Sequence, residues 1–169
     1  MLNTKDKYPS TLAYGYVWNY LNSKGVTEKS IGELAMGLQK KFLPEVPLEK
    51  YISATLEITR KWDILNCCMV GIALDKDASN KELDEPLQTI MDEDLGVFAV
   101  DEVLAYYGFS SLYGGIGVTS AGWLDKEKTG IISKLDQDKT SVNVFLDDLI
   151  VGLVACVSAK IAHDYTGVK

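Results

Sequence analysis

The segment from about Asn143 to His163 limits the fold of this chain more than any other part of the sequence. It is apolar nearly all round, and its longest uninterrupted apolar run is the nine residues Leu149 to Val157. A helix that is apolar on every side has to be buried on every side, whereas a membrane-spanning helix needs about 20 apolar residues in a row. The sequence therefore predicts a central buried helix surrounded by other helices, and no transmembrane span.

Helical spacing of apolar residues recurs along the rest of the chain. The helices that it predicts cover about residues 10–25, 27–43, 47–74, 79–91, 96–112 and 131–135. A Gly-rich loop is predicted between Gly114 and Gly122, with the one candidate extended piece near Ile116 to Thr119. The fold class that follows is all-α, a single-domain orthogonal multi-helical bundle over residues 1–169 around the buried C-terminal helix.

Charge and composition exclude several classes of partner. The chain has 17 Lys and Arg against 24 Asp and Glu, a net charge of −7, and phosphate backbones bind basic rather than acidic surfaces. We therefore expect no nucleic-acid partner. Met1 to Ser10 is polar and lacks the apolar stretch of a signal peptide, and three cysteines form no disulfide framework. These features predict a cytoplasmic protein, with peripheral membrane contact left open.

Common catalytic and nucleotide-binding motifs are absent. His163 is the only histidine and ends the last predicted helix, so we interpret it as structural or solvent-facing, which disfavours histidine-based catalysis and zinc sites. No stretch has the glycine and lysine spacing of a phosphate-binding loop, and Gly115 and Gly117 lack the third glycine of a dinucleotide fingerprint. Carboxylate chemistry is what remains.

Two pairs of acids lie inside apolar stretches. Asp147 and Asp148 open the buried last helix, and Asp101 and Glu102 stand between Val100 and Val103. For a generic pair, stabilisation of a helix N-terminus is the more common role. Buried carboxylates, however, are rare unless they are paired or bind a metal. Four such acids predict a cation site, and oxygen-only ligands suit Mg²⁺ or Mn²⁺ rather than Zn²⁺.

A further group follows the predicted Gly-rich loop. Asp125 is a candidate metal ligand, nucleophile or base, and Lys126 and Lys128 are candidates for binding a phosphate as point charges. The alternative is an ordinary exposed loop.

The acidic blocks resemble a known family. Val100–Val103, Gly122–Lys126 and Phe145–Gly152, in this order, are similar to phosphatidylglycerophosphatase A, and more closely to its soluble Gram-positive branch, the low-temperature-requirement C proteins. The resemblance covers about 96–163, with 1–95 as a helical N-terminal part. It implies a Mg²⁺-dependent phosphatase that acts on phosphatidylglycerophosphate or a related phosphorylated lipid or small molecule.

The resemblance also implies roles for single residues. Asp101, Asp125 and Asp148 would be catalytic, and Asp101, Glu102, Asp147 and Asp148 would bind the metal. Membrane-bound members carry a Gly/Pro/Thr-rich N-terminal motif, which Met1 to Leu95 lacks. The alternative is therefore a non-catalytic helical regulator, or a lipid- or phosphate-binding protein, that retains the metal site. The composition also allows a homodimer.

Overall fold

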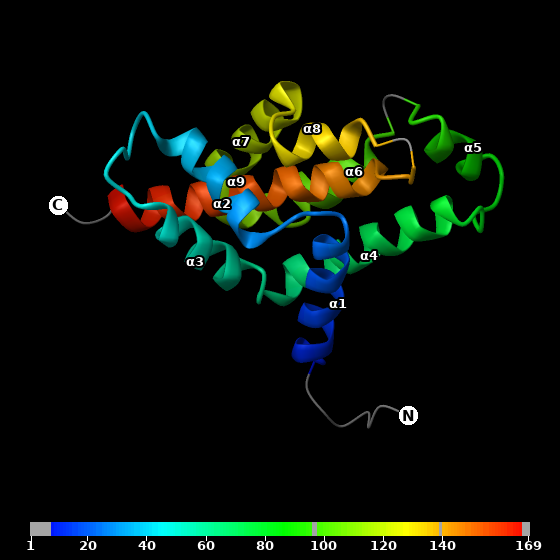
Figure 1. Ribbon diagram of the computed structural model, residues 1–169, viewed down its shortest axis with the longest axis horizontal. Coiled ribbons are helices and arrows are strands. Elements are labelled where there is room, and N and C mark those ends of the chain that lie inside the picture. Colours follow the sequence, from blue (N-terminus) through cyan, green and yellow to red (C-terminus); the bar gives the residue numbers. More distant parts are fainter. Residues whose placement is uncertain (1–7, 96–97, 139, 167–169) are drawn as a thin grey trace.

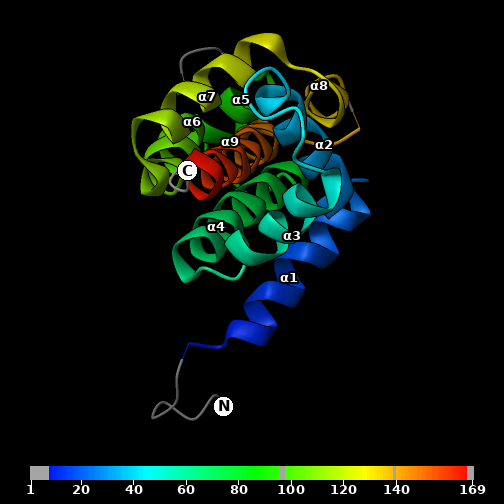
Figure 2. The ribbon, with the colours of Figure 1, turned by 90° about the vertical axis from the view of Figure 1, so that its left-hand side faces the viewer.

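Helix α9 (Val144–Thr166) runs through the centre of the molecule, as predicted. The computed structural model describes residues 8–95, 98–138 and 140–166, and every residue from Val144 to Ala159 is buried. Figures 1 and 2 show the other helices arranged around this axis. The predicted all-α fold is confirmed, and the described residues include no strand.

The first two helices begin where the sequence predicts. Helix α2 (Glu28–Gln39) starts after Thr27, whose side chain accepts a hydrogen bond from the Ser30 backbone N–H at 3.1 Å, while Ser30 Oγ accepts one from Thr27 N–H at 3.0 Å. This reciprocal capping satisfies two backbone donors. Helix α1 (Ser10–Ser23) starts at Ser10 itself.

The prediction of a single helix over 47–74 is wrong, because a first helix ends at Ile58 and a second one begins after it. Helix α3 (Leu48–Ile58) and helix α4 (Trp62–Ser79) are separate, and Lys61 between them is extended. The Thr59 hydroxyl donates to the Thr55 carbonyl at 2.8 Å and accepts from Trp18 Nε1 at 3.3 Å. Such back-bonding bends helices. Helix α3 packs on α2 and α9, whereas α4 packs on α1 and α9.

The helix predicted over 79–91 is found only after Pro86, the residue that the sequence allowed to interrupt it. Ser79 is the last residue of α4, and the next helix, α5 (Leu87–Asp92), begins directly after Pro86. The fixed φ and missing N–H of proline suit this position next to the first turn.

The Gly-rich segment is a helix rather than the predicted loop with an extended piece. Helix α6 (Val100–Glu102) continues into the π-helix η1 (Val103–Tyr107), then the 3₁₀ helix η2 (Ser110–Tyr113) and helix α7 (Gly114–Glu127). A Cβ on Gly117 would lie 2.1 Å from the Ser110 carbonyl oxygen. Glycine is needed there for close packing. The predicted helix start at Gly96 lies outside the described residues.

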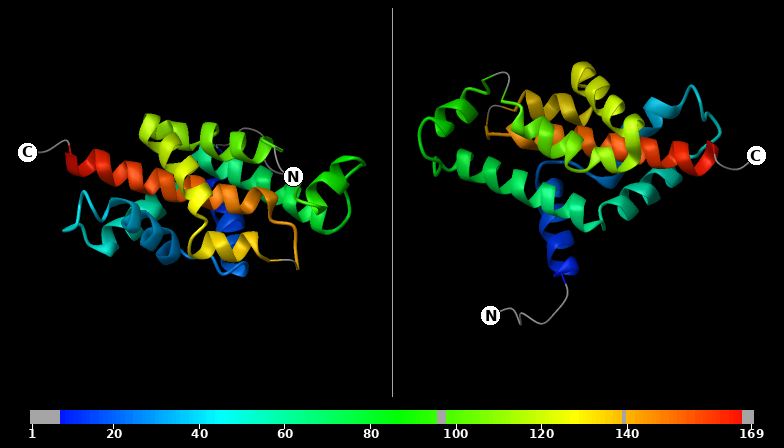
Figure 3. Two further views of the ribbon diagram at one scale, coloured as in Figure 1. Left: turned by 90° about the horizontal axis from the view of Figure 1, so that it is seen from above. Right: turned by 180° about the vertical axis from the view of Figure 1, so that it is seen from behind.

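Close packing also joins α7 and the η helices to α9, which Figure 3 shows from above and from behind. A Cβ on Gly152 would lie 2.7 Å from the Phe109 ring, so glycine permits this close approach. Helix α8 (Ile131–Asp136) is found where predicted, and His163 is exposed. Within the described ranges, no helix is both long enough and apolar enough to cross a membrane.

Candidate functional site

A buried carboxylate from α4 fixes the first turn of α9. Asp75 is fully buried, and its Oδ1 and Oδ2 accept hydrogen bonds from the backbone N–H groups of Phe145 at 3.0 Å and Leu146 at 2.8 Å. These donors have no partner within their own helix. Burial raises the pKa of Asp75 to about 7, against the lowering effect of the two backbone hydrogen bonds. Asp75 thereby sets the position of the two acids that follow.

Asp147 faces a lysine. Its Oδ1 accepts from the Asp148 backbone N–H at 2.9 Å, and its Oδ2 lies 3.3 Å from Lys128 Nζ. The same ammonium group pairs with Asp136 of α8. Burial raises the pKa of Asp147 to about 6, and the charge of Lys128 opposes this rise. Lys128 therefore links α8 to the first turn of α9.

Asp148 is buried beside a tyrosine and other acids. The Tyr106 hydroxyl of η1 donates to Asp148 Oδ1 at 2.9 Å. Burial raises the pKa of Asp148 to about 8, with further contributions from the charges of Asp147 and Asp101, while the Tyr106 hydrogen bond acts in the opposite direction. The pKa of Tyr106 is raised by burial and by the nearby Asp148. Without a cation, this environment favours the protonated form of the carboxyl group.

The second pair of acids comes from the short helix α6. Ala99 precedes this helix with a φ of +66°, a conformation that non-glycine residues rarely adopt. Asp101 Oδ1 accepts from the Glu102 backbone N–H at 2.8 Å. Asp101 is half-buried, and burial raises its pKa; Glu102 is exposed.

These acids line one pocket of about 230 Å³, here called the acid pocket. Its charged residues are Asp94, Asp101, Glu102, Asp125, Lys128, Asp147 and Asp148. Asp125 reaches it from the last turn of α7, and Lys128 follows the end of that helix. Of the residues singled out from sequence, only Lys126 does not line the acid pocket; its side chain is exposed.

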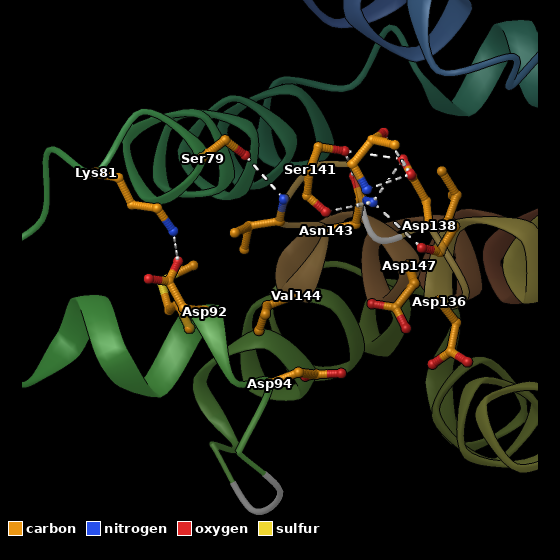
Figure 4. Close-up of a pocket in the computed structure, with 14 residues that line it drawn as sticks. Ser79, Lys81, Asp92, Asp94, Asp136, Asp138, Ser141, Asn143, Val144 and Asp147 are labelled. Atoms are coloured by element: carbon orange, nitrogen blue, oxygen red, sulfur yellow. Dashed lines mark hydrogen bonds and ion pairs between the residues drawn. The ribbon is translucent and has the colours of Figure 1, made fainter.

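An adjoining hollow of about 310 Å³ shares Asp94, Val144 and Asp147 with the acid pocket. Figure 4 shows this hollow at the N-terminal end of α9, with the carboxylates of Asp136 and Asp147 near each other. At its far edge Lys81 Nζ pairs with Asp92 at 2.7 Å. Asp147 therefore lines both hollows.

The acid pocket has the donor chemistry for a hard cation, but its side chains are not arranged as a closed cage. Among the residues that the structure describes, no three His, Cys, Asp or Glu side chains lie close enough together to hold one metal ion. Oxygen-only donors and buried carboxylates with raised pKa values do suit Mg²⁺ or Mn²⁺. The same carboxyl groups can also accept or donate a proton near neutral pH.

Three residues around the site were not predicted from the sequence. Tyr106 donates to Asp148, Asp75 accepts from the backbone of the first turn of α9, and Asp136 pairs with Lys128. The sequence did contain a signal for Asp75, because this acid lies on the apolar side of a helix. Tyr106 and Asp136 carried none, since their partners depend on tertiary packing.

The chain is similar to several known proteins. A family model described as Phosphatidylglycerophosphatase A matches residues 25–163. Two uncharacterized proteins of Bacillus subtilis (strain 168) are similar: YpjQ, 36% identical over 145 residues (86% of this chain and 81% of that protein), and YutG, 37% identical over 144 residues (85% and 86%).

Solved structures agree with the fold. The crystal structure of ypjQ from Bacillus subtilis has a TM-score of 0.90 and 33% identity, and covers 96% of this chain and 100% of that chain. The crystal structure of low temperature requirement C protein from Listeria monocytogenes has a TM-score of 0.87 and 35% identity, with 91% and 97% covered.

Proposed function

Because this chain belongs to the phosphatidylglycerophosphatase A family, we propose that it is a Mg²⁺-dependent phosphatase. Its substrate would be the phosphomonoester of phosphatidylglycerophosphate, or a related phosphorylated lipid or small molecule. The observation that carries the proposal is the acid pocket, where carboxylates from α6, α7 and α9 line one cavity beside a single lysine. Family membership supports phosphatase chemistry, and the composition of the pocket supports a metal-assisted form of it.

The proposed metal ligands are Asp101, Glu102, Asp147 and Asp148. A bound Mg²⁺ would act as a Lewis acid on phosphate oxygens and neutralise developing negative charge. Burial raises the pKa values of Asp147 to about 6 and of Asp148 to about 8. A buried acidic cluster of this kind is stabilised by an opposing charge, which supports a cation as its partner.

The other residues would bind substrate and move protons. Lys128 Nζ, positioned by Asp136 and Asp147, would contact a phosphate oxygen as a point charge. A water molecule would form the new P–O bond while the ester P–O bond breaks, giving inorganic phosphate and an alcohol. Asp101, Asp125 and Asp148 are the candidates to accept the proton of this water, and an acid of the same set would return a proton to the leaving alcohol.

Phosphate release tests the proposal directly. We expect release from phosphatidylglycerophosphate with Mg²⁺, its loss with a chelator, and a decrease of at least about 100-fold in Asp148→Asn, in line with the loss of a residue that acts in proton transfer. Asp63→Asn is the matched control, because Asp63 is an exposed acid in the first turn of α4. No release from lipid or soluble phosphomonoesters would refute the proposal.

Calorimetry tests the alternative, a non-catalytic protein that still binds the metal. Mg²⁺ binding that Asp147→Asn abolishes, without turnover of any phosphomonoester, would identify the protein as a binding or regulatory protein that retains the metal site. Absence of Mg²⁺ and Mn²⁺ binding in a folded protein would refute the metal part of the proposal.

A further inference from the structure

An apolar groove of about 430 Å³ lies between the turn after α2 and helix α7, with α9 beneath it. Leu38 and Phe42 line one side, and Ile116 and Trp123 line the other. Polar groups in its floor are already paired, since Gln39 Nε2 donates to Ser158 Oγ at 2.7 Å. An apolar occupant would therefore leave these two groups satisfied.

The rims of the apolar groove are unusually exposed for such large side chains. Phe42 is 71% exposed, Trp123 is 62% exposed and Ile116 is 47% exposed. Single exposed apolar residues are common, but a group of them around one groove marks an interaction surface. Aromatic side chains are also the residues enriched where a protein meets the interfacial layer of a membrane.

Lysines flank both aromatic residues. Lys40 and Lys41 directly precede Phe42, and Lys126 lies one turn after Trp123 on α7; all three are exposed. Within the described part of the chain, none of the three forms an ion pair or a side-chain hydrogen bond. Glu45 is the acid nearest in sequence to Lys41, and Asp125 and Glu127 stand on either side of Lys126; Asp125 faces the acid pocket instead. In a chain of net charge −7, three unpaired lysines beside exposed aromatic residues indicate an anionic partner.

The position of Lys126 supports this assignment. The sequence suggested it as a phosphate ligand in the active site, but its side chain lies outside the acid pocket, on the same helix as Trp123. A phosphate that meets Lys126 would therefore come from outside the active site. Lipid head groups supply such phosphates next to an apolar layer.

We propose that the apolar groove and its flanking lysines form a peripheral docking surface for an anionic phospholipid bilayer. Phe42 and Trp123 enter the interfacial layer, and Lys40, Lys41 and Lys126 contact lipid phosphates. The turn after α2 and the C-terminal part of α7 both lie on the upper side of Figure 1, where one planar surface can meet them. A second copy of the chain fits less well, because a symmetric contact sets the lysines of both copies against each other.

Docking would also bring lipid to the active site, a consequence that rests on the proposed function. Trp123 precedes Asp125 of the acid pocket by two residues on α7, about 3 Å along the helix axis. The two side chains point to different sides of the helix, so α7 separates the apolar groove from the acid pocket. A bilayer at the groove thus lies beside the pocket without filling it.

Vesicle sedimentation tests docking without any need for catalysis. The probes are phosphatidylcholine vesicles with and without phosphatidylglycerol. We expect binding to the anionic vesicles, weaker binding at high salt, and little binding to neutral ones. The double variant Lys40→Gln/Lys41→Gln should lower the partition coefficient about 25-fold, at about fivefold for each lysine. Phe42→Ser/Trp123→Ser should lower it similarly, and because these side chains are exposed, the variant should stay folded by circular dichroism.

Leu12→Ser and Lys76→Gln provide matched controls, since both residues are exposed but lie on α1 and α4, on the lower side of Figure 1. Equal binding by the wild type and the groove variants would overturn the proposal. So would a dimer that Phe42→Ser/Trp123→Ser converts to a monomer in sedimentation velocity. Hydrolysis of a short-chain soluble substrate without vesicle binding would refute docking alone, whereas vesicle binding without any hydrolysis would refute only the proposed function.

Discussion

Neutralising Asp148 is expected to stabilise the metal-free protein, although the substitution removes a residue of the candidate site. Burial, together with the charges of Asp147 and Asp101, raises the pKa of Asp148 to about 8, compared with an ordinary value of 3.8. Between these two pH values the folded protein binds a proton that the unfolded chain releases. The free energy of unfolding should therefore fall as pH rises from about 4 to about 8.

The size of the effect follows from the same values. At about 1.4 kcal/mol per pH unit, ionisation of Asp148 lowers the stability by ~5 kcal/mol over this range. An asparagine keeps the oxygen that accepts from Tyr106, but one unpaired amide N–H costs ~1–3 kcal/mol. We expect Asp148→Asn to gain ~2–4 kcal/mol at about pH 8.5, a rise in Tm of ~5–10 °C for a chain of this length. At pH 5 the carboxyl group is already protonated, and the gain should nearly vanish.

Thermal unfolding followed by circular dichroism at both pH values, with a chelator present, measures this difference. Asp63→Asn controls for the loss of one negative charge at an exposed position. An Asp148→Asn variant that is no more stable than the wild type at pH 8.5, or whose gain is the same at pH 5, would refute the argument that an unpaired buried charge limits stability.

Three further predictions concern metal binding and the packing of the helices. Mg²⁺ should raise the Tm of the wild type at pH 8 but not that of Asp147→Asn, as differential scanning fluorimetry would measure; equal shifts would contradict the proposed ligand set. Asp75→Ala should lower the free energy of unfolding in urea by ~2–4 kcal/mol, because two backbone donors of α9 lose their acceptor, and Asp75→Asn should cost less, since it keeps one acceptor. Gly117→Ala should cost ~2–3 kcal/mol in the same assay because its Cβ would meet the Ser110 carbonyl, whereas Gly15→Ala, with open space around it, should not destabilise the protein.

The parts of the fold that could be predicted are those in which local pattern and tertiary packing agree. The apolar α9 and the capped start of α2 at Thr27 are examples. The break between α3 and α4 could not be predicted, because no Gly or Pro marks it and the Trp18–Thr59 hydrogen bond joins distant parts of the chain. Helix α7 was interpreted as a loop because glycine is a poor helix former, whereas Gly117 is required there by contact with η2.

For the candidate site, the absence of histidine-based and nucleotide-binding motifs in the sequence left the acids as candidates, and these acids line one pocket. The role of each acid stays a prediction. The assignment of Lys126 failed to match the pocket because it assumed a loop. On a helix, neighbouring residues point about 100° apart, so Asp125 can face the pocket while Lys126 does not. The supporting contacts of Tyr106 and Asp75 depend on which helices meet, and a single sequence does not contain that information.

The central position of α9 also has a consequence for how the chain is made. Helices α2, α3, α4, α6, α7 and α8 all pack on α9, and all of them leave the ribosome before it does. During synthesis their apolar faces have no final partner, and such partly formed states tend to aggregate. We expect the nascent chain to depend on chaperones until α9 emerges. A stalling sequence that delays α9 should reduce the soluble yield more than one placed earlier in the chain.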